Sequence, residues 1–153
     1  MQKSEEYIID RILWKAGQYK LPTKHALFFN NLPLDLQNHL SDQIETTISG
    51  TPILYFTKPS GEWTLICSKQ IISNNKREIT RVDLQNILEL RPTAFPEVTT
   101  ERPTDIKNTI QKSEWHELTL LDKHQHKHIL HAYTGVDFFS LWNILLMIKR
   151  FFE

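Results

Sequence analysis

Cysteine, glycine and an excess of either charge are scarce in this sequence of 153 residues, and each shortage excludes a class of protein. The lone cysteine, Cys67, excludes an internal disulfide framework. Eighteen basic residues balance eighteen acidic ones, which removes the electrostatic basis for non-specific nucleic-acid binding. Each of the four glycines suits a helix end, a turn or the entry to a helix, so no glycine-rich phosphate loop remains.

The chain also has little that would send it to a membrane or out of the cell. Its first fifteen residues carry acids where a signal peptide requires a cationic segment followed by an apolar run. The most apolar stretch, 136–152, includes Asp137, Ser140 and Asn143 and is shorter than the roughly 20 residues that span a bilayer. We therefore expect a cytoplasmic protein that does not act at a membrane surface.

Two stretches before residue 50 have the apolar spacing of amphipathic helices. In 4–16 the apolar residues recur at helical intervals, and Gly17 follows where a left-handed helix cap is expected. A second helix is predicted over 34–49 and ends at Gly50, because its apolar residues fall four apart and form one broad stripe. That stripe consists of Leu36, Leu40, Ile44 and Ile48. Residues 1–50 are thus expected to be a helical N-terminal extension.

Beyond residue 50 the sequence changes to short runs rich in β-branched and aromatic residues, which predict strands. Residues 58–61 and Asn74-Asn75 separate these runs, and glycine and asparagine tolerate the positive φ angles of tight turns. The expected strands are 52–57, 62–68, 70–73, 77–82, 85–90, 113–122 and 127–135.

A long polar segment and a strongly apolar final helix complete the pattern. Residues 91–112 contain three prolines and no periodicity, which predicts a loop. Asp137 is a suitable N-cap for a helix that reaches about Phe151. Polar residues form only a thin stripe on this helix, so we expect more than one neighbouring element to cover it.

The middle of the chain, with "WTLICSKQIIS" and "ITRVDLQNILEL", resembles the bacterial members of the pleckstrin-homology-like superfamily. The later "WHELTLLD" and "KHILHAYTGVDFFSLWNILLMI" are similar to their closing hairpin and helix. The resemblance covers about 51–153 and implies an α+β fold, in which about seven antiparallel strands form a barrel that a C-terminal helix closes. With the extension over 1–50, we expect a single domain over 1–153.

This superfamily consists mainly of binding and scaffolding modules, so the resemblance implies a binding function and not an enzyme. Its inositol-phospholipid site uses basic residues between the first two strands, but here the loop 57–62 offers Lys58 offset by Glu62. We therefore expect a protein partner, with no cofactor and no nucleic acid. The alternative is an immunity-type protein that neutralises a toxin.

Loops on a rigid barrel are where binding residues concentrate, so contact residues are expected there. Lys58, Arg91 and Phe95 are the candidates. An aromatic ring such as Phe95 either anchors a partner or packs back onto the barrel. No catalytic set is expected, because alternation places Cys67 on one strand face with apolar neighbours, where its thiol is buried and unreactive.

The stretch "DKHQHKHILH", 122–131, contains four of the seven histidines. In a strand His124, His126 and His128 would share one face and could converge on a metal, and a metal-dependent hydrolase is therefore a further alternative. The flanking runs pair best, however, if residues 123–127 form the connecting turn. No cysteine and no carboxylate beyond Asp122 completes the ligand set. We expect an exposed hairpin tip and no bound metal.

Overall fold

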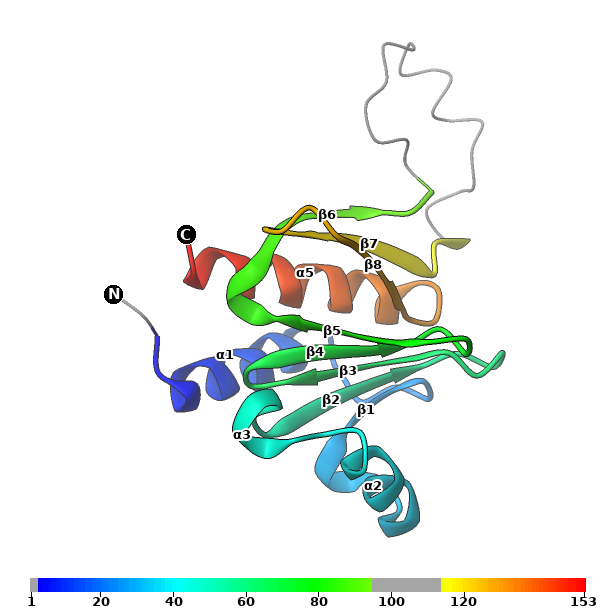
Figure 1. Cartoon of the computed structure of the whole chain (residues 1–153). Coiled ribbons are helices and arrows are strands. Elements are labelled where there is room, and N and C mark those ends of the chain that lie inside the picture. Colours follow the sequence, from blue (N-terminus) through cyan, green and yellow to red (C-terminus); the bar gives the residue numbers. More distant parts are fainter. Residues whose placement is uncertain (1–2, 95–113) are drawn as a thin grey trace.

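The computed structural model describes residues 3–94 and 114–153 and shows an α+β fold with two antiparallel sheets (Figure 1). The larger sheet has the order β1-β2-β3-β4-β5, and the smaller has the order β6-β7-β8. The helices are α1 (Glu5–Gln18), α2 (Leu34–Ser41), α3 (Thr46–Ser49) and α5 (Val136–Phe151), with 3-10 turns η1 (Phe29–Asn31) and η2 (Leu84–Asn86). The strands are β1 (Ala26–Phe28), β2 (Pro52–Thr57), β3 (Trp63–Cys67), β4 (Gln70–Asn74), β5 (Ile79–Asp83), β6 (Ile87–Pro92), β7 (Glu117–Asp122) and β8 (Lys127–His131).

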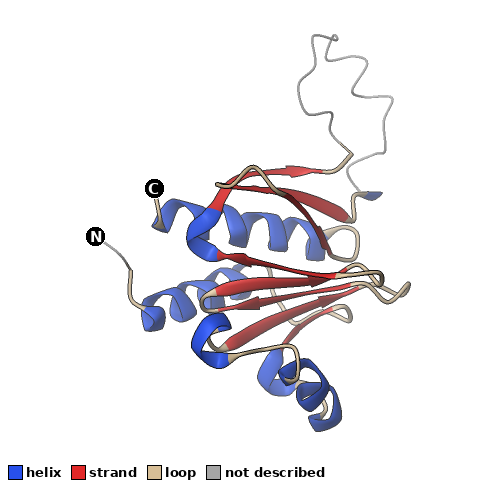
Figure 2. Cartoon of the chain, viewed as in Figure 1, coloured by secondary structure: helices blue, strands red, loops and turns tan. Residues whose placement is uncertain are grey.

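The α+β class and the order of strands followed by a final helix are as the sequence predicts (Figure 2). Every run expected to be a strand overlaps one, and β2 has the predicted bounds of 52–57. From β2 onward, four strands belong to the larger sheet and three to the smaller, and α5 follows. The predicted closure into a barrel is not seen in the part of the chain that the structure describes, because no backbone ladder joins the two sheets there.

The N-terminal extension is not purely helical, since it also provides strand β1. This three-residue strand pairs with β2, Ala26 lying opposite Phe56, and it extends the larger sheet at its edge. Three apolar residues are too few to show an alternating pattern, so this strand could not be recognised locally. It forms because the edge of β2 offers unpaired backbone groups.

One apolar core lies between the sheets, α1 and α5. It includes Ile12 of α1, Phe56 of β2, Leu118 of β7 and Leu145 of α5, all essentially inaccessible to water. Figure 1 shows α1 running behind the larger sheet and α5 lying between the two sheets, with the smaller sheet over it. As expected, several elements cover the final helix. Among the described residues no helix has the length and apolar character needed to cross a bilayer.

A second core lies on the opposite face of the larger sheet, where η1 and α2 cover it. Leu40 of α2 packs there with Trp63, Leu65 and Cys67 of β3. Both faces of β3 are consequently buried, in contrast to a strand with one solvent face. The prediction that Cys67 is buried is confirmed, and this burial raises the pKa of its thiol to about 12, which disfavours the reactive thiolate.

The predicted end of the first helix at Gly17 is wrong, because α1 continues through Gln18. Lys20 adopts the left-handed conformation with φ of 59°. The backbone N–H of Leu21 donates to the Ala16 carbonyl, and that of Lys20 donates to Gly17, which is the Schellman pattern. The pattern therefore falls three residues later than glycine indicated.

The single helix predicted over 34–49 is also wrong, since α2 ends at Ser41 and α3 is a separate turn of four residues. A spacing of four residues advances by about 40° around a helix at each step. From Leu36 to Ile48 the drift amounts to about 120°, too much for one buried face. Leu40 is buried, whereas Ile48 is 52% exposed.

Two further local predictions differ from the structure, namely which residue has a positive φ angle in the β4–β5 turn and which residue is the N-cap of α5. The residue with positive φ in the β4–β5 turn is Lys76, at 78°, while Asn74 and Asn75 accept hydrogen bonds from the following backbone N–H groups. The N-cap of α5 is Gly135, and no side chain caps this helix end. Asp137 lies inside the helix and accepts a hydrogen bond of 2.6 Å from the Thr23 hydroxyl.

Candidate functional site

The conspicuous histidines form the tip of the β7–β8 hairpin, as predicted, and Asp122 organises it. One Asp122 oxygen accepts the backbone N–H groups of His124 and His126, at 2.8 and 3.0 Å. The other lies 2.8 Å from Nε2 of His128. Gln125 completes the turn with a φ of 69°. Burial raises the pKa of Asp122, but the hydrogen bonds from the His128 ring and the two backbone groups outweigh it and hold the pKa at about 2.

These histidines do not converge on a common point. The side chain of His126 is 77% exposed, whereas that of His128 is turned inward against Asp122. In residues 3–94 and 114–153 no three histidine, cysteine or acidic side chains are placed to hold a metal ion. The hairpin therefore supplies no support for the metal-dependent alternative.

A second group of ionisable side chains, which we call the buried cluster, consists of Lys58, Glu62, His116 and His131. The Lys58 ammonium lies 2.9 Å from Nδ1 of His116 and 3.4 Å from the Glu62 carboxylate. Lys58 is only 7% exposed. Its side chain therefore points into the protein, and the loop 57–62 does not present it as the surface contact that the sequence indicated.

His131 is the most deeply buried member of the cluster. Burial, followed by the charge of Lys58, lowers its pKa to about 4, so the ring is neutral at physiological pH. Within the described residues neither of its ring nitrogens has a hydrogen-bond partner, nor has Oε1 of Glu62. A hydrogen bond from Ser60, with a smaller effect of the Lys58 charge, lowers the pKa of Glu62 to about 2. The cluster thus combines the Lys58–Glu62 ion pair with the neutral imidazole of His131, whose hydrogen-bonding capacity is not satisfied by the described residues.

The buried cluster lies where the two sheets meet. Strand β8 is an edge of the smaller sheet, so its outward backbone groups need partners from elsewhere. The Thr64 hydroxyl both donates to the His131 carbonyl and accepts its N–H, each at 2.8 Å. The Ser73 hydroxyl donates to the Ile129 carbonyl at 2.8 Å. Hydroxyl groups of β3 and β4 therefore replace the missing ladder between the sheets.

The remaining predicted contact residues are Arg91 and Phe95. Arg91 is half-buried on β6, and Phe95 lies outside the described residues. Sequence reasoning missed His116 and His131 as cluster members. Alternation within a strand indicates only which face of its own strand a residue occupies, and it says nothing about Lys58, which lies 58 residues from His116.

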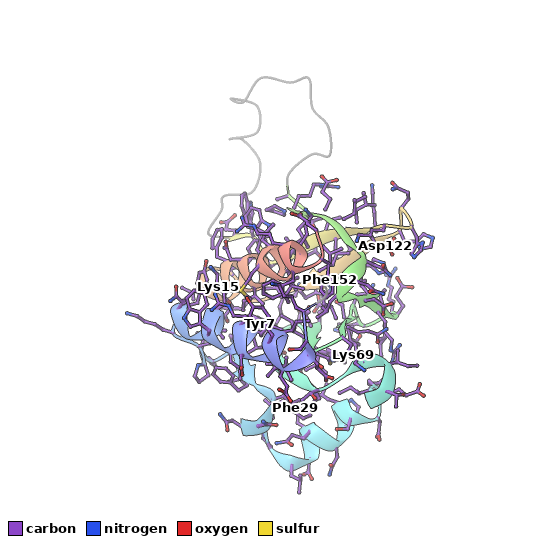
Figure 3. All side chains as sticks on the ribbon, turned by 90° about the vertical axis from the view of Figure 1, so that its left-hand side faces the viewer. Tyr7, Lys15, Phe29, Lys69, Asp122 and Phe152 are labelled. Atoms are coloured by element: carbon purple, nitrogen blue, oxygen red, sulfur yellow. The ribbon has the colours of Figure 1, made fainter. Side chains whose placement is uncertain are left out.

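A different feature, the outer face of α1, carries aromatic and basic side chains. Tyr7, Arg11, Trp14 and Lys15 fall within about a third of a turn of one another, and together with Lys3, which precedes the helix, we call them the α1 stripe. The Arg11 guanidinium lies 4.0 Å from the centre of the Trp14 ring, and the Lys3 ammonium lies 5.1 Å from that of Tyr7. Figure 3 looks onto this face, with Tyr7 and Lys15 labelled. Tyr7 and Trp14 remain 40% and 46% exposed.

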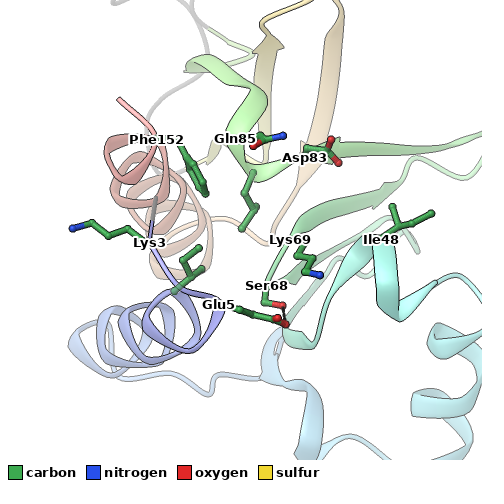
Figure 4. A pocket seen from close by; sticks show the side chains of 10 residues that line it. Lys3, Glu5, Ile48, Ser68, Lys69, Asp83, Gln85 and Phe152 are labelled. Atoms are coloured by element: carbon green, nitrogen blue, oxygen red, sulfur yellow. Dashed lines mark hydrogen bonds between the residues drawn. The ribbon is translucent and has the colours of Figure 1, made fainter. Parts of the chain in front are cut away.

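A cleft of about 350 Å³ adjoins the start of α1, between α5, α3 and the β3–β4 turn (Figure 4). Ile8 and Leu84 provide apolar lining, and Lys3 and Lys69 lie on opposite sides. Glu5 accepts a hydrogen bond of 2.6 Å from the Ser68 hydroxyl. Charges of both signs surround the cleft, so its lining favours no single class of ligand.

Comparisons of the chain with protein-family models, with curated proteins and with solved structures found no match.

Proposed function

We propose that this protein is a non-catalytic binding module of the pleckstrin-homology-like type and that it acts by contacting another protein. The succession of four strands, three strands and a C-terminal helix from β2 onward supports the architectural part of the proposal. Lys58 in the first loop of that unit is turned inward and paired with Glu62, which argues against a phosphoinositide site there. The protein-binding part rests on the α1 stripe.

The α1 stripe has the residue types that dominate binding energy at protein interfaces. Tryptophan, tyrosine and arginine are enriched among such residues, and Trp14, Tyr7 and Arg11 lie together on one helix face. The stacking of Arg11 on Trp14 restrains both side chains before a partner arrives, which lowers the entropic cost of binding. The apolar side of α1 is occupied by the core, so the stripe lies on the side of the helix that faces away from it.

The charge of the stripe indicates the chemistry of the partner. Lys3, Arg11 and Lys15 surround the two rings, whereas the acids Glu6 and Asp10 lie along one flank. We infer that the partner presents an apolar or aromatic side chain within an acidic segment, because acids would meet the cations while the apolar group covers Trp14.

The test first uses this protein to capture a partner from the source cells. The partner is then purified, and its direct binding to this protein is measured by calorimetry. Trp14→Ala should weaken binding by about 30-fold or more, as expected for a central interface residue. Leu34→Ala is the matched control, because Leu34 is 70% exposed but lies on α2, away from the stripe, and binding should change less than about twofold.

Two outcomes would contradict the proposal. One is a partner that binds Trp14→Ala as tightly as the unchanged protein. The other is substrate turnover by the purified protein that is lost when the buried cluster is altered. If the captured partner is an enzyme whose activity falls on binding, the immunity-type alternative becomes the specific biological role.

A further inference from the structure

The contacts that join the two sheets differ in whether they can change charge. Thr64 and Ser73 use hydroxyl groups, which stay neutral across the physiological range. The contact between Lys58 and His116 joins two ionisable groups, the first in the β2–β3 loop and the second immediately before β7. Histidine is the side chain that ordinarily changes its charge between pH 5 and 8. This link between the sheets, unlike those of Thr64 and Ser73, can therefore respond to pH.

The geometry of the link fixes the protonation state that it requires. A lysine ammonium has three donors and no acceptor, so the hydrogen bond of 2.9 Å uses the lone pair of His116 Nδ1. The imidazole must then be neutral, with its proton on Nε2. A proton added at Nδ1 removes the acceptor and places a second cation against Lys58, which has little water to screen it.

The other charges around His116 give its ring a second position to occupy. On the side of the larger sheet lie Lys58 and Glu62, and this carboxylate is already held by Lys58 and Ser60. On the other side His116 shares a cavity of about 160 Å³ with Glu114 and Glu117. These two carboxylates favour an imidazolium.

The remaining neighbour of the link is His131 of β8, which is close enough to interact electrostatically with His116. His131 is neutral in the folded protein until the pH falls to about 4, because burial and the charge of Lys58 oppose its protonation. It therefore adds no charge to the link between pH 7.5 and 5.5.

We propose that the Lys58–His116 contact is a pH-sensitive latch between the two sheets. In the closed state neutral His116 accepts from Lys58. In the open state protonated His116 leaves Lys58 for the carboxylates of Glu114 and Glu117, and the β2–β3 loop separates from the start of β7. Opening admits water to the unpartnered ring nitrogens of His131 and the unpartnered oxygen of Glu62, which are buried in the closed state.

The latch can be tested by amide hydrogen exchange at pH 7.5 and 5.5, with correction for the intrinsic pH dependence of exchange. In the unchanged protein, protection in 58–64 and 115–118 should fall by about tenfold or more, the effect of losing a hydrogen bond to a charged group. In His116→Asn the amide oxygen still accepts from Lys58 but does not titrate, so protection should be the same at both pH values. His124→Asn, at the exposed hairpin tip, is the matched control and should behave like the unchanged protein.

Lys58→Met provides a second route if His116→Asn does not fold. Without the ammonium the latch cannot close, so protection at pH 7.5 should already equal that of the unchanged protein at pH 5.5. Equal protection at both pH values in the unchanged protein would overturn the proposal. So would an undiminished response in His116→Asn, or full protection at pH 7.5 in Lys58→Met. None of these results depends on the identity of a binding partner.

Discussion

The histidines at the tip of the β7–β8 hairpin are close in the sequence but exposed in the fold. Those of the buried cluster are far apart in the sequence but are packed together between the sheets. His126 has a side chain that is 77% exposed, and His131 is 2% exposed. His124 and His126 are separated by one residue. His116, immediately before β7, and His131, at the end of β8, lie far apart in the sequence, and both are close to Lys58 of the β2–β3 loop.

The difference teaches that histidine density and chemical perturbation are separate properties. At the tip, alternating histidines sit in a turn, where regular alternation fails and the rings diverge. In the buried cluster, loss of water and the nearby Lys58 charge change the proton affinity of His131. Unusual environments come from burial and long-range contact, so the less conspicuous group contains the more perturbed histidine.

The largest expected effect concerns the hydroxyl that supports the cluster. Thr64→Val should lower the free energy of unfolding by about 4 kcal/mol, because it leaves the buried N–H and carbonyl of His131 without partners at about 2 kcal/mol each. Urea denaturation at pH 7.5 measures the change. Thr80→Val is the matched control, since the Thr80 hydroxyl is buried without a partner and its removal should cost less than about 0.5 kcal/mol. Equal effects of the two substitutions would contradict the bridging role of Thr64.

A somewhat smaller effect is expected from His131 as the pH falls. Its pKa is about 4 in the folded protein against 6.5 ordinarily, so the unfolded chain binds the proton first. The contribution of His131 should leave stability unchanged above pH 6.5 and should lower it below that pH by about 1.4 kcal/mol per pH unit, to a total of about 3 kcal/mol near pH 4. Urea denaturation between pH 7.5 and 4.5 measures the slope.

The control compares a substitution of His131 with a substitution of the exposed His124. His131→Phe should make the slope shallower by the amount that His131 contributes, whereas His124→Asn should leave it unchanged, because the exposed ring at the tip has no buried environment to lose. A slope that is the same in His131→Phe as in the unchanged protein would show that His131 does not carry the pH dependence.

The contrast between the two groups also marks how far sequence reasoning extends. Strands β2 to β8 and the hairpin tip were predictable, because alternation and turn residues are local signals. Strand β1 was not, because it depends on pairing with β2. The break between α2 and α3 was missed because a four-residue spacing was taken as one stripe, although its slow drift exposes Ile48.

Within the buried cluster, only the offset of Lys58 by Glu62 could be read from the sequence. A tight loop brings residues four apart close together in space. The ion pair of 3.4 Å between Lys58 and Glu62 confirms that the two charges offset each other. The inward direction of Lys58 could not be predicted, because it depends on His116 of the other sheet. Such contacts follow from how the sheets pack, which periodicity within a strand does not record.

The smallest expected effect concerns the histidines that first attract attention. The double substitution His124→Ala and His126→Ala should change the free energy of unfolding by less than about 0.5 kcal/mol, because both side chains are exposed and Asp122 bonds to their backbone N–H groups, which alanine retains. Thermal melts of metal-free protein with and without added Zn²⁺ extend the test. Since the rings do not converge, zinc should not raise the melting temperature of the unchanged protein. A rise that disappears in the double variant would instead show that the hairpin tip can gather its histidines around a metal, and would make the exposed group the chemically active one.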